Sequence, residues 1–184
     1  MNLRVSKLKG FIGGLLLTIA PLLVYSGFPL VGFLLAILGF TALLLFLRSL
    51  SRIYDEPMIW FYAKLSTLSL VSGLLLAYLA SLDKLLSSPY LLGVTLIPAL
   101  IDVITFANLS QLFTTLAYYT LLLLAAYSLL RAFTIASIKS REWKLEVVGY
   151  SVLVTIVAGS TLLLPIISGF LLVLVSIYGR LREP

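Results

Sequence analysis

Long apolar stretches alternate along the chain with short polar or turn-forming ones, and this alternation is its main structural signal. The hydrocarbon region of a bilayer is about 30 Å thick, so an α-helix needs about 20 apolar residues to cross it. We therefore expect six transmembrane helices. They correspond approximately to residues 9–26, 29–47, 58–82, 112–131, 145–163 and 165–179.

The longest apolar stretch, from Pro89 to Leu130, contains a single charged side chain, Asp102. It is long enough for two membrane crossings, and the number it makes decides the orientation of every later helix. One crossing gives six transmembrane helices. Two crossings give seven and move the carboxyl-terminal part of the chain to the other side of the membrane.

The basic residues distinguish these two topologies, because lysine and arginine accumulate on the cytoplasmic side of membrane proteins. With one crossing, nearly all of them fall on one side and only Lys84 lies on the other. The residues on the shared side are Arg4, Lys7, Lys9, Arg48, Arg52, Arg131, Lys139, Arg141, Lys144, Arg180 and Arg182, with Lys64 near them. We therefore predict an all-α bundle of six helices with both termini in the cytoplasm, and a polar cytoplasmic loop from Arg131 to Lys144.

Residues 89–110 are then left at the outer face, before the single crossing. Four polar residues follow one another there at near-helical spacing, which favours an amphipathic helix. They are Thr95, Asp102, Thr105 and Asn108. We expect an interfacial or re-entrant helix over this segment.

Small residues recur at helical spacing in several of the apolar stretches. Gly10, Gly13 and Gly14 cluster in the first stretch and allow close contact with another helix. Two further faces of small residues are expected to mediate helix packing: Gly32, Ala36 and Gly39 in the second stretch, and Ser69, Gly73 and Ala77 in the third. Such faces either join copies of the chain or pack within one copy.

Composition places the chain among membrane proteins. Its 184 residues are 61% hydrophobic and 11% charged, against about 25% charged residues in soluble domains. The net charge of +6 comes from basic residues at the ends of apolar stretches, where they meet anionic lipid headgroups. We therefore expect the bilayer as the partner and no nucleic acid, with a homo-oligomer or a larger membrane complex as further options.

The absence of cysteine and histidine removes much chemistry. Disulfides, thiol catalysis and the usual haem, zinc, copper and iron–sulfur ligands are excluded, as are Ser–His and Cys–His nucleophile pairs. No phosphate-binding loop, dinucleotide motif or metal-ligand spacing is present. We expect no cofactor, no metal and no catalytic residues.

Three polar residues are candidates for function: Asp102, Lys64 and Asn108. Ionisable groups at membrane depth are costly and often mark ion or proton paths. For Asp102, hydration at the outer interface is the simpler interpretation, and for Lys64 it is extension of the side chain back to the interface. Asp55 and Glu56 are expected to cap the helix that begins at Pro57 rather than to act as a catalytic pair.

Two parts of the chain resemble a known family. The first part is the stretch from Ile53 to Phe61 (IYDEPMIWF). The second part is Arg131 to Leu181, which contains a basic segment, a glycine-containing helix, a short turn and a final helix. Both are similar to the archaeal membrane proteins grouped as domain of unknown function 996. The resemblance implies a helical architecture in an archaeal plasma membrane, and it implies no catalytic residues.

These observations favour a non-enzymatic function. We expect a small membrane scaffold or accessory subunit that acts by helix–helix association. The alternative is a transporter or channel for a small solute or ion, with Asp102 in the outer gate. A membrane enzyme acting on lipids is disfavoured, because the necessary acid–base groups are missing.

Overall fold

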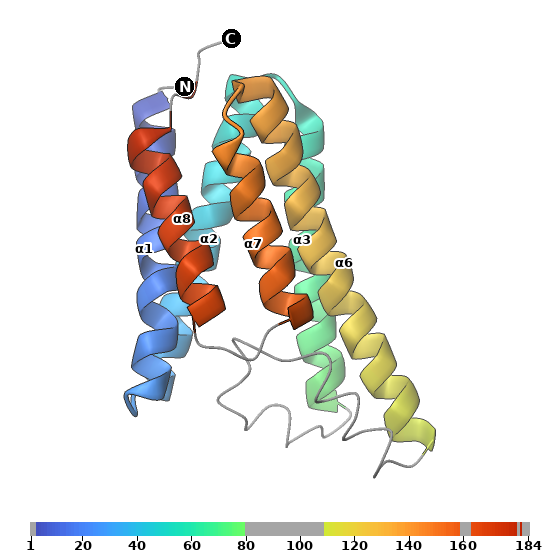
Figure 1. Cartoon of the computed structure of the whole chain (residues 1–184). Helices are drawn as coiled ribbons and strands as arrows, with labels where there is room; N and C mark the ends of the chain where they lie inside the picture. The colour runs from blue at the N-terminus through green and yellow to red at the C-terminus, as the bar shows by residue number, and fades with distance from the viewer. Residues whose placement is uncertain (1–2, 80–108, 159–162, 180, 182–184) are drawn as a thin grey trace.

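The computed structural model describes residues 3–79, 109–158, 163–179 and 181 (Figure 1). Within these ranges all the regular secondary structure is α-helical. The helices are α1 (Leu3–Tyr25), α2 (Pro29–Ile53), α3 (Pro57–Leu79), α6 (Leu109–Ser140), α7 (Lys144–Ala158) and α8 (Leu163–Tyr178). The prediction of an all-α protein is therefore confirmed for the described part of the chain.

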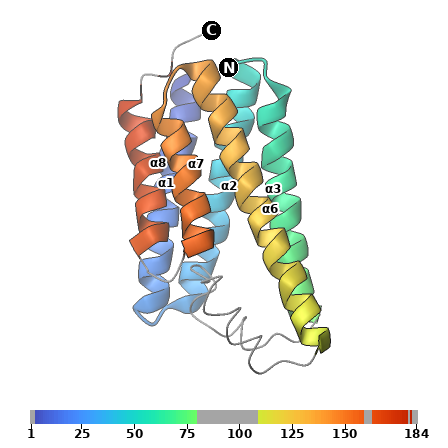
Figure 2. The same ribbon diagram turned by 45° about the vertical axis from the view of Figure 1, so that its right-hand side comes forward.

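Successive described helices run in alternating directions, and the start of α1 and the end of α8 lie at the same end of the bundle (Figure 1). Each helix packs against the next in the order α1, α2, α3, α6, α7 and α8, and α8 packs in turn against α1 (Figure 2). A smaller contact joins α2 to α6 across the interior. The described helices thus form a closed ring.

Four helical segments are long and apolar enough to cross a membrane: Leu3–Tyr25, Leu30–Ile53, Pro57–Leu76 and Leu116–Ser140. The described part of α7 has 15 residues and that of α8 has 16, so these parts extend about 22 and 24 Å, less than the thickness of the hydrocarbon region. The described chain is therefore a helical membrane protein with four helices of spanning length and two shorter ones beside them.

Several helices are longer than the apolar stretches that predicted them. Helix α1 begins at Leu3 rather than near residue 9, and α2 continues past Arg48 and Arg52 to Ile53. Hydropathy marks where the hydrocarbon ends, whereas a helix continues while its backbone bonds and packing allow. Basic residues near a helix carboxyl terminus are also favourable, because they interact with the helix dipole.

The predicted polar loop from Arg131 to Lys144 is wrong over most of its length. Helix α6 continues without interruption to Ser140, and only residues 141–143 separate it from α7. The reason is packing: Ala132, Phe133 and Ala136 are fully buried in the core of the bundle. Arg131 and Lys139 occupy exposed faces of this helix, which its buried side chains hold in the core.

The predicted outer element falls almost wholly outside the described residues. Only its last two positions are described, and they form the first turn of α6, which begins at Leu109. The remaining positions, including Asp102 and Asn108, are not among those that the structure describes.

Candidate functional site

By their positions along the helices, all the charged residues that the structure describes lie toward one end of the bundle, the end at which α1 begins (Figure 1). We call this the charged end. Its basic members are Arg4, Lys7, Lys9, Arg48, Arg52, Lys64, Arg131, Lys139, Arg141 and Lys144, and its acidic members are Asp55, Glu56, Glu142 and Glu146. The opposite halves of the described helices carry no charge.

Several of these charged groups join one helix to another element of the bundle. Lys139 of α6 lies 2.9 Å from a carboxylate oxygen of Glu56, at the α2–α3 turn. In α1, the Lys9 ammonium donates to the hydroxyl of Ser49 on α2 over 3.1 Å. The Lys7 ammonium donates to the carbonyl of Gly179, just after α8, over 2.6 Å. Charge at this end is thus used to hold the helix ends together.

The α2–α3 turn and the α6–α7 turn, both at the charged end, have the same backbone conformation. Asp55 after α2 and Arg141 after α6 both have positive φ values, of 48° and 55°. The following residues, Glu56 and Glu142, donate their amide protons to carbonyls five positions earlier, over 3.0 and 3.2 Å. This is the Schellman arrangement that closes a helix carboxyl terminus. Asp55 and Glu56 therefore belong to the turn that closes α2, whereas the sequence predicted that they would cap the start of α3 at Pro57.

A tyrosine joins the two turns. Tyr54, at the end of α2, is buried, and its phenol is hydrogen-bonded to Ser140 at the end of α6. Burial raises the pKa of the Tyr54 phenol above its ordinary value near 10, and the bond to Ser140 lowers it by a smaller amount. The phenol is therefore neutral at physiological pH and acts as a polar contact between the turns.

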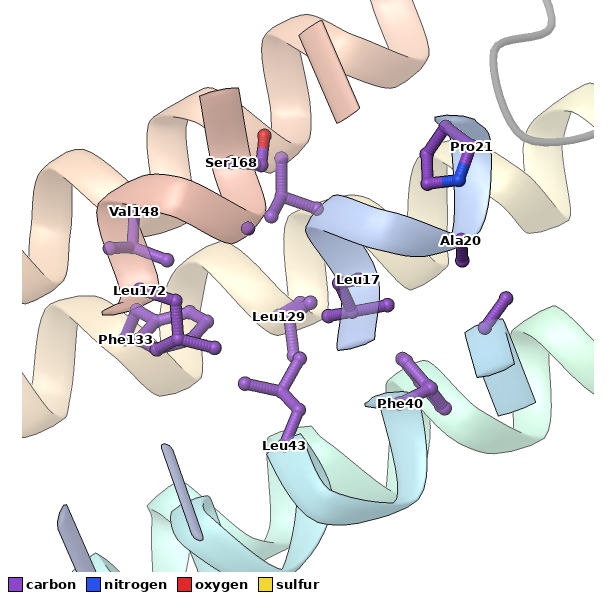
Figure 3. Close-up of a pocket in the computed structure, with 13 residues that line it drawn as sticks. Leu17, Ala20, Pro21, Phe40, Leu43, Leu129, Phe133, Val148, Ser168 and Leu172 are labelled. Atoms are coloured by element: carbon purple, nitrogen blue, oxygen red, sulfur yellow. The ribbon is translucent and has the colours of Figure 1, made fainter. Parts of the chain in front are cut away.

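Near mid-length, the ring encloses a partly open cavity of about 190 Å³ (Figure 3). Every described helix except α3 contributes to its wall. The lining residues are Leu17, Ala20, Pro21, Ala36, Phe40, Leu43, Leu129, Phe133, Val148, Val152, Ser168, Gly169 and Leu172. Ser168 carries the one polar side chain among them. Such a wall suits an apolar occupant and offers no acid–base chemistry.

The three polar candidates from the sequence are not brought together by the described structure. Lys64 is exposed, in the second turn of α3 at the charged end, and its extension to a membrane interface stays a prediction. Asp102 and Asn108 lie outside the described residues. Among the residues described, no group of three or more histidine, cysteine or carboxylate side chains is placed to hold a metal ion.

The expected packing residues make contacts within the chain. A Cβ atom added at Gly32 would lie 2.7 Å from the Ala20 carbonyl oxygen of α1, and one added at Gly39 would lie 3.0 Å from Leu16. Ser69 and Gly73 are buried in α3, and Gly73 faces Tyr118 of α6. Ala36 lines the cavity instead. Ala77 belongs to α3, and its side chain is outside the described part.

A further close helix contact involves a residue that the sequence did not single out for packing, Gly169 of α8. A Cβ at Gly169 would lie 2.8 Å from the carbonyl oxygen of Gly14, and a Cβ at Gly14 would lie 2.7 Å from that of Gly169. The expected close approach at Gly10, Gly13 and Gly14 is confirmed, with Gly13 against α2 and the other two against α8. In the sequence, Gly169 is an isolated glycine in an apolar stretch, and this pattern does not reveal which helix packs against it.

Comparisons with protein-family models, with curated proteins and with solved structures find no match to this chain.

Proposed function

We propose that the chain crosses the membrane six times, with both termini and the charged end in the cytoplasm. The supporting observation is the gathering of the described basic residues at one end, which satisfies the positive-inside rule for every described helix. Residues 109–130 of α6 carry no charge and extend about 33 Å, which fits the hydrocarbon region, and Arg131 then marks its cytoplasmic edge.

The described parts of α7 and α8, on either side of residues 159–162, are shorter than the other four helices. Helices α7 and α8 are antiparallel neighbours, and α8 packs along α1, whose length is sufficient to span. A helix shorter than the bilayer is accommodated by local thinning or by association with longer helices. Helix α8 associates with α1 in this way, and α7 associates with α6.

We further propose that the protein is a non-enzymatic scaffold or accessory subunit of the membrane. One observation supports this most: several of the described charged groups take part in interhelical bonds, while the central cavity is lined almost entirely by apolar side chains. An enzyme needs titratable or metal-bound groups that converge on a pocket. Membership of the family grouped as domain of unknown function 996, in an archaeal plasma membrane, is part of the same proposal and rests on the sequence resemblance.

Affinity purification from native membranes in a mild detergent tests the scaffold proposal. A tagged chain is purified beside a second copy with a different tag, and the recovered proteins are quantified. We expect a membrane partner, or the second copy, in a fixed ratio to the bait. An unrelated bundle of similar hydropathy serves as the control, and recovery of the bait alone under several detergents contradicts the proposal.

A transporter or channel is the second candidate, because its binding site would be expected near mid-membrane, where the cavity lies. In this alternative Asp102 belongs to the outer gate. Flux of small ions into proteoliposomes, compared between the wild type and Asp102→Asn, separates the two functions. We expect no flux above empty liposomes; flux that Asp102→Asn abolishes establishes the transporter.

A further inference from the structure

The wall of the central cavity excludes water as its occupant. Apart from Ser168, whose polar atoms are engaged in another interaction, the lining side chains are hydrocarbon or glycine. A buried water needs two to four polar partners, and cavities without them stay dry. The occupant must therefore be apolar, or the cavity must be empty.

The size of the cavity suits a short length of hydrocarbon. An engineered apolar cavity of about 150 Å³ in another protein takes up benzene, so one of about 190 Å³ has room for several carbon atoms. Small residues create this space: Ala20, Ala36 and Gly169 line the wall where larger side chains would fill it. A lipid headgroup or a polar solute would find too few hydrogen-bond partners there.

The surroundings of the bundle supply such an occupant. Large apolar side chains cover the outer faces of the helices, for example Leu34 and Leu38 on α2 and Leu75 on α3, which places lipid chains around the ring. The cavity is partly open, and no described residue of α3 lines it. We propose that the cavity binds the end of one hydrocarbon chain of a membrane lipid. This binding site goes beyond the scaffold function and does not depend on it.

Photolabelling in a bilayer tests the proposal. The full chain is placed in nanodiscs that contain phosphatidylglycerol with a diazirine near the end of one acyl chain, and labelled residues are mapped by mass spectrometry. We expect labels on the lining residues Leu17, Phe40 and Leu172, and fewer labels there from a diazirine close to the headgroup. Lipid-facing residues such as Leu38 are labelled as well and provide the internal reference.

Two cavity-filling variants and a matched control complete the experiment. Ala36→Phe and Val152→Phe place a ring in the cavity from two different helices, whereas Leu34→Phe places the same ring on the outer face of α2. We expect a several-fold loss of labelling of the lining residues in both filling variants and none in the control. Gel filtration and circular dichroism identify any variant that fails to fold.

Two results overturn the proposal. One is labelling of Leu17, Phe40 and Leu172 in the wild-type protein that does not exceed background, which needs no variant and means that no lipid chain enters. The other is labelling of these residues that a folded filling variant leaves unchanged, which means that the lipid reaches them from outside the cavity.

Discussion

Glycine residues determine how closely the helices approach one another in this bundle. In a bilayer there is no hydrophobic drive between helices, so close van der Waals packing must supply the attraction. Gly14 and Gly169 bring the backbones of α1 and α8 into contact, and an added Cβ at either site would lie within 3 Å of backbone atoms. At Gly73 the nearest atom would be an ordinary 3.5 Å away, on Leu121.

These distances predict opposite effects for the same substitution. Gly14→Ala and Gly169→Ala are expected to destabilise the protein by about 1–3 kcal/mol, because backbone cannot move aside as a side chain can. Gly73→Ala is expected to be neutral or to stabilise by up to about 1 kcal/mol, because alanine favours the helix. Equilibrium unfolding in detergent measures all three. Equal effects at Gly14 and Gly73 would contradict the described packing of α1 on α8.

The buried phenol of Tyr54 predicts a loss of stability at high pH. Its pKa is raised in the folded protein, so folding is favoured fully below the ordinary tyrosine pKa of about 10 and less favoured as the pH rises above it. Thermal melts in detergent between neutral pH and strongly alkaline pH should show this loss, and Tyr54→Phe should reduce it. Tyr127→Phe, at an exposed position, is the control. Identical alkaline profiles for the wild type and Tyr54→Phe would be evidence against a buried phenol.

At the scale of helices, hydropathy identified where the described elements lie but not where all of them end. Helix α6 was expected to stop near Arg131, and the structure carries it on to Ser140. The continuation depends on burial of Phe133 and Ala136 against other helices, and this information is not local to the segment. The cavity was equally hidden, because its wall is assembled from five helices.

An ion pair between Lys139 and Glu56 joins the end of α6 to the α2–α3 turn. The side chains are 47% and 20% exposed, so water screens the pair. A double-mutant cycle with Lys139→Ala and Glu56→Gln should therefore give a coupling energy of about 0.2–1 kcal/mol, as for other partly exposed pairs. The cycle is measured by unfolding in detergent at low and high salt, and coupling should fall as salt is added. A coupling of zero at low salt would mean that the pair does not hold the helix end.

At the scale of the whole molecule, the central claim is that the ring of helices stands across the membrane with its charged end inside the cell. The alternating directions of the described helices and the uncharged opposite halves both follow from this arrangement. The proposed orientation comes from the sequence, because the side of the membrane on which basic residues accumulate does not depend on how the helices pack.

Cysteine labelling in intact cells tests this claim most directly, because the natural chain has no cysteine. Ser140, at the end of α6, is fully buried and unsuitable as a probe, whereas Trp143, in the α6–α7 turn, is 66% exposed. Ser26, in the α1–α2 turn at the uncharged end, is exposed as well. Single-cysteine variants Trp143→Cys and Ser26→Cys therefore report on opposite ends of the bundle.

An impermeant maleimide is added to cells that express each variant, before and after permeabilisation. The account predicts labelling of Ser26→Cys in intact cells, and labelling of Trp143→Cys only after permeabilisation. Labelling of Trp143→Cys from outside, or of both variants from the same side, would contradict the proposed orientation of the bundle.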